Sequence, residues 1–340
     1  MASGEVVGGD FGMSERKLAS VQRITAIAPI EGADAIECAS VLGWKVVVKK
    51  GQFKVGDLAV YLEIDSVPPD AEPYRFLWKN TEMRPNNFRI KTIRLRGQIS
   101  QGILFPVEVD GIEGDDVTET LGVTKYEAPL PRGSDDIEGQ FFDGVSKTDE
   151  ERVQSAEGAK RLESLRGRSF YITTKCDGAS MTVAQHDGVT KVASRNYRLA
   201  DVEGSSYWGA ARNSGLIAFI DEMPWLAAQG ELVGPGIQNN RLGLKSHECR
   251  VFNIYDLEDG TFLDLGMMLS LSIMFGFQLV PVLEHGHLFN YDQEQLLQLA
   301  EGKYVGTSNE REGIVIRSNG TGPRVSFKAI SNRFLLKGGE

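Results

Sequence analysis

Cysteine and histidine are scarce in this chain. Its 340 residues include three cysteines, Cys38, Cys176 and Cys249, and four histidines. Three scattered cysteines cannot form a disulfide framework, and no Cys-x-x-Cys pair marks a zinc site. His247 lies close to Cys249, but no further ligand is near them in sequence, so we expect a core or surface role for both. This composition indicates a reducing compartment, and we expect an intracellular protein, cytoplasmic or nuclear.

Long apolar segments are also scarce. One uncharged stretch, residues 265–283, is about as long as the ~18 residues that a membrane-spanning helix needs. Ser270, Ser272 and Gln278 interrupt it, and Gly276 would end a helix. We therefore expect a buried helix followed by a short strand, and no membrane association. The N-terminus has no apolar core of the signal-peptide type, which predicts no export.

The chain has no excess of positive charge. Thirty-seven Lys and Arg stand against 47 Asp and Glu, and the net charge of −10 at first sight disfavours nucleic acid as a partner. However, residues 108–151 carry 14 acidic and three basic residues, so this segment alone accounts for the sign. The remainder is nearly neutral, and local basic patches on it can bind RNA over a short footprint.

Roughly the first third of the chain has the pattern of short β-strands. Apolar, often β-branched runs are separated by turns that contain glycine. Five short strands in about a hundred residues are typical of an OB-fold barrel. We expect a flexible N-terminal tail at 1–15 and an OB-fold domain at 16–128. The predicted strands lie within residues 18–30, 35–50, 57–67, 88–97 and 101–109.

The rest of the chain predicts a second, mixed domain. A turn-rich acidic stretch follows the OB-fold, and we expect residues 129–146 to be a linker. Thr148 and the three acids after it can cap a helix that continues through residues 152–165. Further along, strands alternate with helical stretches, which predicts an α+β domain at 147–340. Two more helices are expected, at 209–223 and at 291–302, the latter with Asp292 as N-cap and Gln295 three residues later.

An apolar strand in the second domain delivers Lys175 to a turn that Asp177 and Gly178 close. This Lys-x-Asp-Gly sequence is compatible with an ordinary hairpin that carries a solvated lysine. It is also compatible with a nucleophilic amine beside a carboxylate, since a lysine attacks only when it is neutral and its surroundings can lower its pKa. The tetrapeptide alone does not decide between the two interpretations.

Further polar and aromatic residues follow at or beside predicted strands, and they could project into one shared cleft. Each has an ordinary alternative as an edge-strand charge, a core phenylalanine or a solvated acid. They are the Ser194–Asn196 segment with Arg195, then Glu231, Phe252, Glu312 and Lys328.

Taken in this order, these residues resemble the motif series of the covalent nucleotidyltransferases, the ATP-dependent ligases and mRNA capping enzymes. The resemblance covers about residues 147–335. DNA ligases and capping enzymes place an OB domain after the last motif, but only residues 329–340 follow Lys328 here. The β-rich module in front is instead similar to the arrangement of Naegleria-type RNA ligases. The implied fold is an N-terminal OB-fold barrel followed by an α+β nucleotidyltransferase domain, ATP-grasp-like and built on antiparallel sheets.

The resemblance implies that Lys175 attacks the α-phosphate of ATP and forms a lysyl-AMP intermediate, with Asp177 and Lys328 as further catalytic residues. Phe252 would stack on adenine. Mg²⁺ or Mn²⁺ would be held, through water, by Asp177, Glu231 and Glu312, which are oxygen donors of the kind that Mg²⁺ prefers. The implied nucleotide-binding residues are Thr174, Arg195, Asn196, Glu231, Phe252, Glu312 and Lys328.

One position departs from the family's pattern. The last motif often has two lysines spaced by one residue, whereas Ile330 occupies the second position here. Arg324 and Arg333 are the substitutes that we consider for this second cation.

The implied activity is the sealing of RNA ends that carry a 3′-hydroxyl and a 5′-phosphate, with a nicked duplex as substrate and a monomeric enzyme. The first domain carries a basic stretch without a single acid, and an OB barrel can use such a face to track a phosphate backbone. A solvated basic edge strand is the alternative. We expect Arg94 and Arg96 to share one strand face. The candidate RNA-binding residues are Arg84, Arg89, Lys91, Arg94 and Arg96.

Two alternative functions remain open at this stage. One is another covalent nucleotidyltransferase, a DNA ligase or a capping-type guanylyltransferase. The other is a non-enzymatic OB-fold RNA-binding protein, against which the complete set of motif lysines and carboxylates argues. The G-x-x-x-x-G-K-[ST], G-x-S-x-G and H-E-x-x-H motifs of other enzyme classes are absent.

Overall fold

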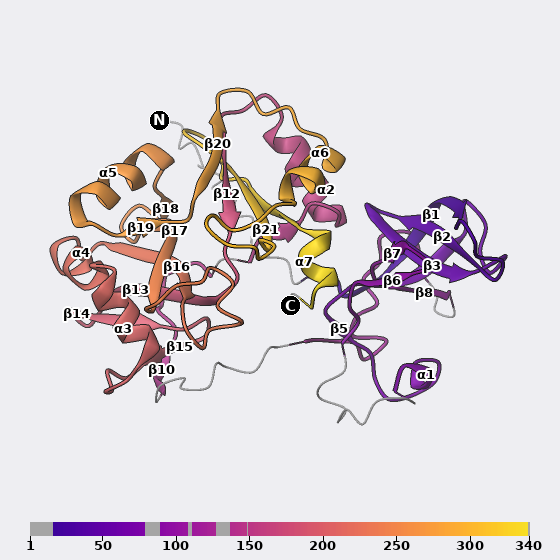
Figure 1. Cartoon of the computed structure of the whole chain (residues 1–340), viewed down its shortest axis with the longest axis horizontal. Coiled ribbons are helices and arrows are strands. Elements are labelled where there is room, and N and C mark those ends of the chain that lie inside the picture. Colours follow the sequence, from indigo (N-terminus) through magenta and orange to yellow (C-terminus); the bar gives the residue numbers. More distant parts are fainter. Residues whose placement is uncertain (1–15, 79–88, 108–110, 127–136, 148, 339–340) are drawn as a thin grey trace, which may run out of the picture. The chain divides into compact units, whose positions relative to one another are not determined.

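A computed structural model describes residues 16–78, 89–107, 111–126, 137–147 and 149–338. The chain divides into two compact units, Met1–Glu127 and Ala128–Glu340 (Figure 1). We describe each unit by itself.

The first unit is a curved antiparallel sheet in the order β3-β2-β1-β4-β8. Its outer strands β3 and β8 also lie beside each other, so the sheet closes toward a barrel (Figure 1). Trp44, Tyr61 and Leu62 are fully buried in its core. This arrangement confirms the expected OB-fold architecture. The strands are β1 (Ala19–Pro29), β2 (Ile36–Val41), β3 (Trp44–Lys49), β4 (Leu58–Leu62) and β8 (Ile103–Pro106).

Two predicted strand runs differ in detail. The run 35–50 is broken into β2 and β3 by a turn in which Leu42 has a positive φ of 50°. The run 88–97 contributes no barrel strand, because its only strand, β6 (Ile93–Leu95), is exposed along its whole length and pairs with β7 (Gln98–Ser100). The unit also contains a short helix, α1 (Arg75–Trp78), and a small ladder between β5 (Ser66–Val67) and β9 (Thr124–Lys125).

The second unit contains two sheets that are antiparallel except for two short parallel pairs, β11 with β22 and β17 with β19. The larger sheet has the order β10-β15-β14-β13-β16-β17-β18, and the smaller one has the order β11-β22-β21-β12-β20. The larger sheet consists of β10 (Ile137–Gln140), β13 (Ala179–His186), β14 (Val189–Ala193), β15 (Tyr197–Leu199), β16 (Leu226–Val233), β17 (Glu248–Asp256), β18 (Thr261–Phe262) and β19 (Gln278–Leu279). The smaller sheet consists of β11 (Glu151–Arg152), β12 (Phe170–Lys175), β20 (Val282–Gly286), β21 (Gly313–Ser318) and β22 (Ser326–Ile330).

Each sheet has its own helices and its own core (Figure 1). Helices α3, α4 and α5 pack on the larger sheet, where Phe219 and Met268 lie in one apolar cluster with Val183. Helices α2 and α6 pack on the smaller sheet, where Leu162 and Leu296 share a cluster. The helices are α2 (Ala156–Leu165), α3 (Ser206–Asn213), α4 (Leu216–Glu222), α5 (Leu265–Phe275), α6 (Gln293–Ala300) and α7 (Asn332–Leu336).

The helices predicted within 265–283 and at 291–302 are confirmed, whereas the one predicted at 209–223 is two helices, α3 and α4, because Gly215 between them adopts a left-handed conformation. Helix α5 ends at Gly276, which adopts a left-handed conformation, and a short strand follows it. Helix α6 has the predicted capping box of Asp292 and Gln295. Among the described residues, no helix is long and apolar enough to cross a membrane.

The first helix of the second unit begins later than predicted. Ser155 caps α2 through its side chain, whereas the preceding acids lie before and within the short strand β11. The capping prediction is therefore wrong for residues 149–151, and Thr148 lies outside the described residues. The range 129–146 also contains β10, which pairs with β15, and Phe141 and Phe142, which are buried in an apolar cluster. Residues 137–142 are thus part of the larger sheet and its packing.

Candidate active site

Lys175 lies where the chain passes from one sheet to the other. It is the last residue of β12, opposite Gly313 of β21, and the next strand, β13, belongs to the larger sheet. The Lys-x-Asp-Gly segment is therefore a crossing between sheets and not a hairpin. A Cβ atom at Gly178 would lie 2.3 Å from the Leu232 carbonyl oxygen and 2.7 Å from Cγ of Glu231, so only glycine fits. This close approach brings the lysine loop against β16.

The amine of Lys175 forms an ion pair with the next predicted motif. Its Nζ lies 2.7 Å from Oε1 of Glu312, whose side chain is 6% exposed. The register of β12 and β21 explains the contact, because Glu312 directly precedes Gly313, the ladder partner of Lys175. Two residues 137 positions apart in sequence thus meet at a strand end, where the lysine keeps partial exposure of 22%.

Asp177 pairs with an arginine that the sequence did not single out. Nε of Arg241, from the loop between β16 and β17, lies 2.8 Å from Oδ2 of Asp177, and both side chains are 12% exposed. The neighbouring thiol does not compete with Lys175 as a nucleophile, because burial raises the pKa of Cys176 to about 12. The loop therefore presents one amine and one paired carboxylate.

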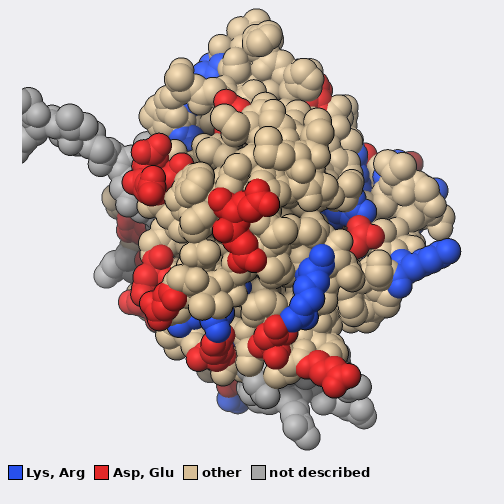
Figure 2. Space-filling view, turned by 90° about the vertical axis from the view of Figure 1, so that its left-hand side faces the viewer, with Lys and Arg blue, Asp and Glu red and all other residues tan. Residues whose placement is uncertain are grey.

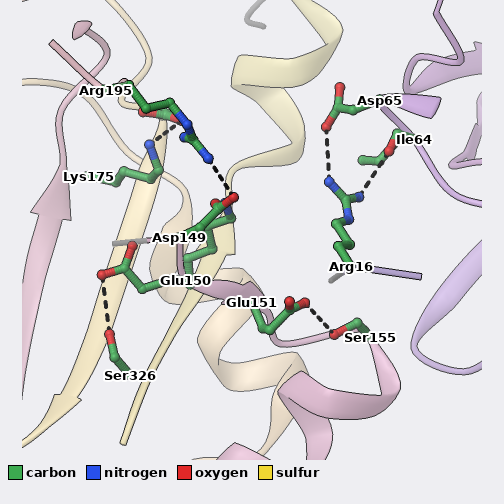
Figure 3. Close-up of polar contacts among 12 residues, drawn as sticks. Arg16, Ile64, Asp65, Asp149, Glu150, Glu151, Ser155, Lys175, Arg195 and Ser326 are labelled. Carbon is green, nitrogen blue, oxygen red and sulfur yellow. Dashed lines mark hydrogen bonds and ion pairs between the residues drawn. The ribbon is translucent and has the colours of Figure 1, made fainter. Parts of the chain in front are cut away.

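The three acids before α2 point to three different groups (Figure 3). Oδ2 of Asp149 lies 2.8 Å from Nη2 of Arg195, and its Oδ1 lies 3.7 Å from Nζ of Lys328. Glu150 accepts hydrogen bonds from Arg317 at 3.2 Å and from the Ser326 hydroxyl at 3.3 Å. Glu151 accepts one from Ser155 at 3.4 Å. Asp149 thus joins two cations of the predicted site.

Glu150 is held in its charged form. Burial opposes ionisation, but the charges of Arg317, Lys328 and Arg324 hold the pKa of this carboxyl below its ordinary value. Sequence reasoning missed the roles of Asp149 and Glu150, because a run of acids before a helix is equally typical of capping. The available signal was their position directly before the strand that pairs with Lys328.

Phe252 lies above a buried arginine. The Arg317 guanidinium is 5.7 Å from the centre of the Phe252 ring and 5.9 Å from that of Tyr171, and Arg317 is 1% exposed. Phe252 itself is half-buried and packs beside Cys176 and Val233. The ring therefore lies near the lysine loop, packed on one side by the Arg317 guanidinium.

Glu231 lies on β16, opposite Ser180 of β13 and Arg250 of β17. Its pKa is raised to about 8, first by burial and then by the negative charges of Glu312 and Asp177, although Lys175 acts in the opposite direction. The three carboxylates predicted to bind metal therefore influence one another.

Replacing Glu231 with glutamine should change the pH dependence of stability. The folded protein holds a proton on Glu231 that the unfolded chain releases, so ionisation between about pH 5 and pH 8 destabilises the fold, and the effect levels off above pH 8. We expect the Tm of the wild-type protein, free of nucleotide and metal, to fall by several degrees more over this range than that of Glu231→Gln.

The control for this prediction is Glu248→Gln. Glu248 lies on β17, is half-buried and pairs with Arg250. Parallel Tm curves for wild type and Glu231→Gln, measured by thermal denaturation at each pH, would contradict the raised pKa.

The carboxylates fit a hard divalent cation reached through water. Among the described residues, no three His, Cys, Asp or Glu side chains are close enough to ligate an ion together directly. Asp177 forms an ion pair with the Arg241 side chain, and Glu312 forms one with the Lys175 side chain. Burial is the main cause of the raised pKa of Glu231 and the charges of Glu312 and Asp177 add to it, so additional positive charge nearby would lower this pKa.

The other predicted nucleotide-binding residues are strand-bound or near strand ends. Thr174 is buried in β12, and its backbone N–H donates to the Pro281 carbonyl. Asn196 lies before β15, and its side-chain oxygen accepts from Lys147 at 3.1 Å. Arg195, one residue earlier, is exposed and reaches Asp149 (Figure 3).

The two substitutes considered for the missing lysine have different surroundings. Arg324 is half-buried, donates to Asn253 at 2.6 Å and lies 3.8 Å over the Phe262 ring; desolvation lowers its pKa to about 10. Arg333 is exposed and pairs with Glu301 at 3.8 Å. The cation that shares a carboxylate with Lys328 is Arg195, through Asp149.

The predicted RNA-binding residues divide into three groups. Arg84 lies outside the described residues. Arg89 is part of the fold, since it lies 3.7 Å from Asp65 and 4.4 Å over the Tyr126 ring with 10% of its side chain exposed. Lys91, Arg94 and Arg96 are exposed on the β6–β7 hairpin.

The predicted pairing of Arg94 with Arg96 on one strand face is wrong. Arg96 lies in the turn after β6 with a positive φ of 48°, because the hairpin reverses there.

On the side of the second unit seen in Figure 2, the described surface shows acidic side chains and fewer basic ones, dispersed among uncharged groups. That side presents no continuous basic patch among the described residues.

Comparison with known proteins gives the same two parts. A family model described as an OB-fold domain matches residues 18–107, and one described as RNA ligase matches residues 168–330. A solved structure of a Naegleria gruberi RNA ligase mutant in the apo form is 38% identical with a TM-score of 0.85, over 95% of this chain and 98% of that chain. Two further structures of that ligase, one with pyrophosphate and one of a mutant with ATP and manganese, are each 39% identical with TM-scores of 0.85, over 94% and 98% of the two chains. A search of curated proteins found no match.

Proposed function

This chain belongs to the RNA ligase family, and we propose that it joins RNA ends carrying a 3′-hydroxyl and a 5′-phosphate through a covalent lysyl-AMP intermediate. It is an ATP-dependent enzyme of the Naegleria type, which the motif order had indicated. The observation that carries the proposal is the position of Lys175, whose amine lies at a strand end between two sheets, paired with a buried carboxylate and close to an aromatic ring.

In the proposed first step, the neutral Lys175 amine attacks the α-phosphorus of ATP. The N–P bond forms while the bond from that phosphorus to pyrophosphate breaks, and the amine proton passes to solvent. AMP is then transferred to the RNA 5′-phosphate, which frees Lys175. Finally the 3′-hydroxyl attacks the activated phosphate and releases AMP.

The surrounding residues have distinct proposed roles. Glu312 orients Lys175, Phe252 stacks on adenine, and Lys328 contacts the α-phosphate as a compact charge. In many family members a second lysine provides another positive charge in the last motif. Arg195 provides that charge here, because Asp149 contacts both Arg195 and Lys328.

Mg²⁺ or Mn²⁺, when bound, neutralises charge on the triphosphate and on the departing pyrophosphate. Asp177, Glu231 and Glu312 would hold it through water. Their carboxylates are the oxygen donors that such ions prefer, and Glu231 already responds to the charges of the other two.

The experiment that tests the proposal has two assays on the full-length protein. Incubation with labelled ATP and Mg²⁺ or Mn²⁺ should produce acid-stable labelled protein, and addition of a nicked duplex with RNA on the 3′-hydroxyl side should convert the label to free AMP and seal the strand. Sealing of DNA alone, or transfer from GTP in place of ATP, would favour a DNA ligase or a capping-type enzyme. Absence of labelled protein would contradict the mechanism.

We further propose that residues 16–128 bind RNA and that residues 147–340 carry out nucleotide transfer. The protein is proposed to act as a monomer in the cytoplasm or nucleus, where its three free, buried cysteines stay reduced. A nicked duplex is the proposed substrate, and sealing rates on single-stranded RNA should be lower.

Replacing Lys91, Arg94 and Arg96 together with alanine should weaken RNA binding while leaving adenylylation unchanged. Each lost phosphate contact lowers the dependence of log Kd on log salt by about 0.7–0.9, so we expect the slope to fall by about two and sealing at moderate salt by about tenfold. Both are measured by titrating labelled nicked duplex at several salt concentrations.

The matched control replaces Lys49, Lys50 and Lys54, three exposed lysines of the same unit, with alanine. Equal losses in the two triple variants would show that only overall charge matters. In that case the hairpin is an ordinary solvated edge.

A further inference from the structure

The hydroxyl group of Tyr304 lies among the backbone groups that carry the proposed reacting residues. It donates a hydrogen bond to the Lys175 carbonyl at 3.0 Å. It accepts one from the Asp177 N–H at 2.9 Å and another from the Glu312 N–H at 3.1 Å. The nucleophile, its paired carboxylate and the Asp177 carboxylate therefore all depend on one oxygen atom.

A phenol has one donor and two acceptor positions, and all three are used here. Tyr304 is 5% exposed, so water does not replace these partners readily. Burial, followed by the charge of Glu312, raises the pKa of Tyr304 above its ordinary value, which keeps the proton that the Lys175 carbonyl requires. The hydroxyl thus ties the end of β12 to the start of β21, where the Lys175–Glu312 pair forms.

The loop that carries Tyr304 is itself anchored. Arg311 donates to the carbonyls of Ala300 at 3.2 Å and Glu301 at 2.9 Å, at the end of α6. Asn309 donates from its side chain to the Arg241 carbonyl at 2.8 Å. Because Arg241 pairs with Asp177, this loop reaches the same carboxylate by a second route.

We propose that Tyr304 is a positioning residue for nucleotide transfer, with its hydroxyl holding the Lys175 and Asp177 backbone and the Glu312 backbone in the register that the attack on ATP needs. The inference rests on the proposed lysyl-AMP mechanism. Tyr304 touches none of the reacting atoms; it acts through the two strand ends. A misplacement of a reacting group by about 1 Å can reduce a rate by about a hundredfold, so one oxygen atom can have a large effect.

The test is Tyr304→Phe, which keeps the ring and removes only the hydroxyl. The matched control is Tyr291→Phe, in the same unit. The hydroxyl of this half-buried tyrosine donates a hydrogen bond of 2.7 Å to Glu284 and makes no contact with the lysine loop among those described. Two measurements are made on the full-length proteins. The first is amide hydrogen exchange without nucleotide, and the second is the rate of self-adenylylation over a range of ATP concentrations.

We expect exchange at the Asp177 and Glu312 amides to accelerate at least about tenfold in Tyr304→Phe and not in Tyr291→Phe. The maximal adenylylation rate should fall about 10- to 100-fold with little change in the KM for ATP, because ATP binding does not use the hydroxyl. The decrease in Tm of Tyr304→Phe should be about equal to, or smaller than, that of Tyr291→Phe.

Three results would overturn the inference. They are unchanged exchange at the two amides, an unchanged maximal rate, and a loss that appears as a raised KM or follows the Tm equally in both variants. Failure of the proposed function is distinguishable, because the wild-type protein would then form no labelled adduct. The exchange measurement needs no activity and still decides whether Tyr304 orders the two strand ends.

Discussion

Replacing Lys175 with alanine is expected to abolish labelling of the protein by ATP, with a loss of at least about a thousandfold, because no other group at the strand end can form the bond to phosphorus. The adjacent Cys176 thiol is buried, and its pKa of about 12 leaves no thiolate to replace the amine. The measurement is acid-stable incorporation of labelled AMP, together with sealing of a nicked duplex.

A second substitution, Lys175→Arg, separates nucleophile from charge. Arginine keeps the ion pair with Glu312 but remains protonated, so it should be as inactive as alanine. Lys160→Ala is the control, since Lys160 is an exposed lysine on α2. Label that survives in either Lys175 variant would place the covalent bond on another residue.

Replacing Glu312 with glutamine is expected to lower the adenylylation rate about 100- to 1,000-fold while the protein stays folded. The change keeps the shape and the backbone contact with Tyr304, but it removes the charge that lies 2.7 Å from the Lys175 amine. Without this partner the amine loses its fixed orientation toward the nucleotide. Single-turnover labelling and circular dichroism measure the two effects.

The control for Glu312→Gln is Glu310→Gln. Glu310 lies two residues earlier, is equally buried and pairs with Lys337 at 2.9 Å, but it belongs to no predicted motif. Its loss should cost some stability and leave the rate nearly unchanged. Equal rate losses in the two variants would mean that Glu312 acts through folding and not through Lys175.

Several elements of the fold were predictable because their signals are local. Apolar, often β-branched runs between turns that contain glycine mark strands such as β1, and the Asp292 and Gln295 capping box marks the start of α6. The Lys-x-Asp-Gly sequence and its downstream motifs indicated the family, since each motif is a short run of residues. These features do not depend on what lies elsewhere in the chain.

Predictions failed where a local pattern was compatible with two structures. Acids before α2 resemble helix caps, but Asp149 and Glu150 instead bind cations from the segment before β15 and from β21 and β22. The basic run around Arg94 resembled a barrel strand, yet the hairpin turn places Arg96 off the strand. Contacts with distant segments decided the first case, and a local reversal of the chain at Arg96 decided the second.

The sequence by itself indicated the OB-fold, the α+β second domain and the order of the motifs, because each of these depends on neighbouring residues. The same local motif is the basis for proposing Lys175 as the nucleophile. Only the tertiary structure decided which partners complete the site. Arg241 reaches Asp177 from a separate loop, and Tyr304 reaches the same loop from 127 residues away. Such contacts depend on how two sheets are joined at Gly178, and no periodicity or spacing along the chain specifies them.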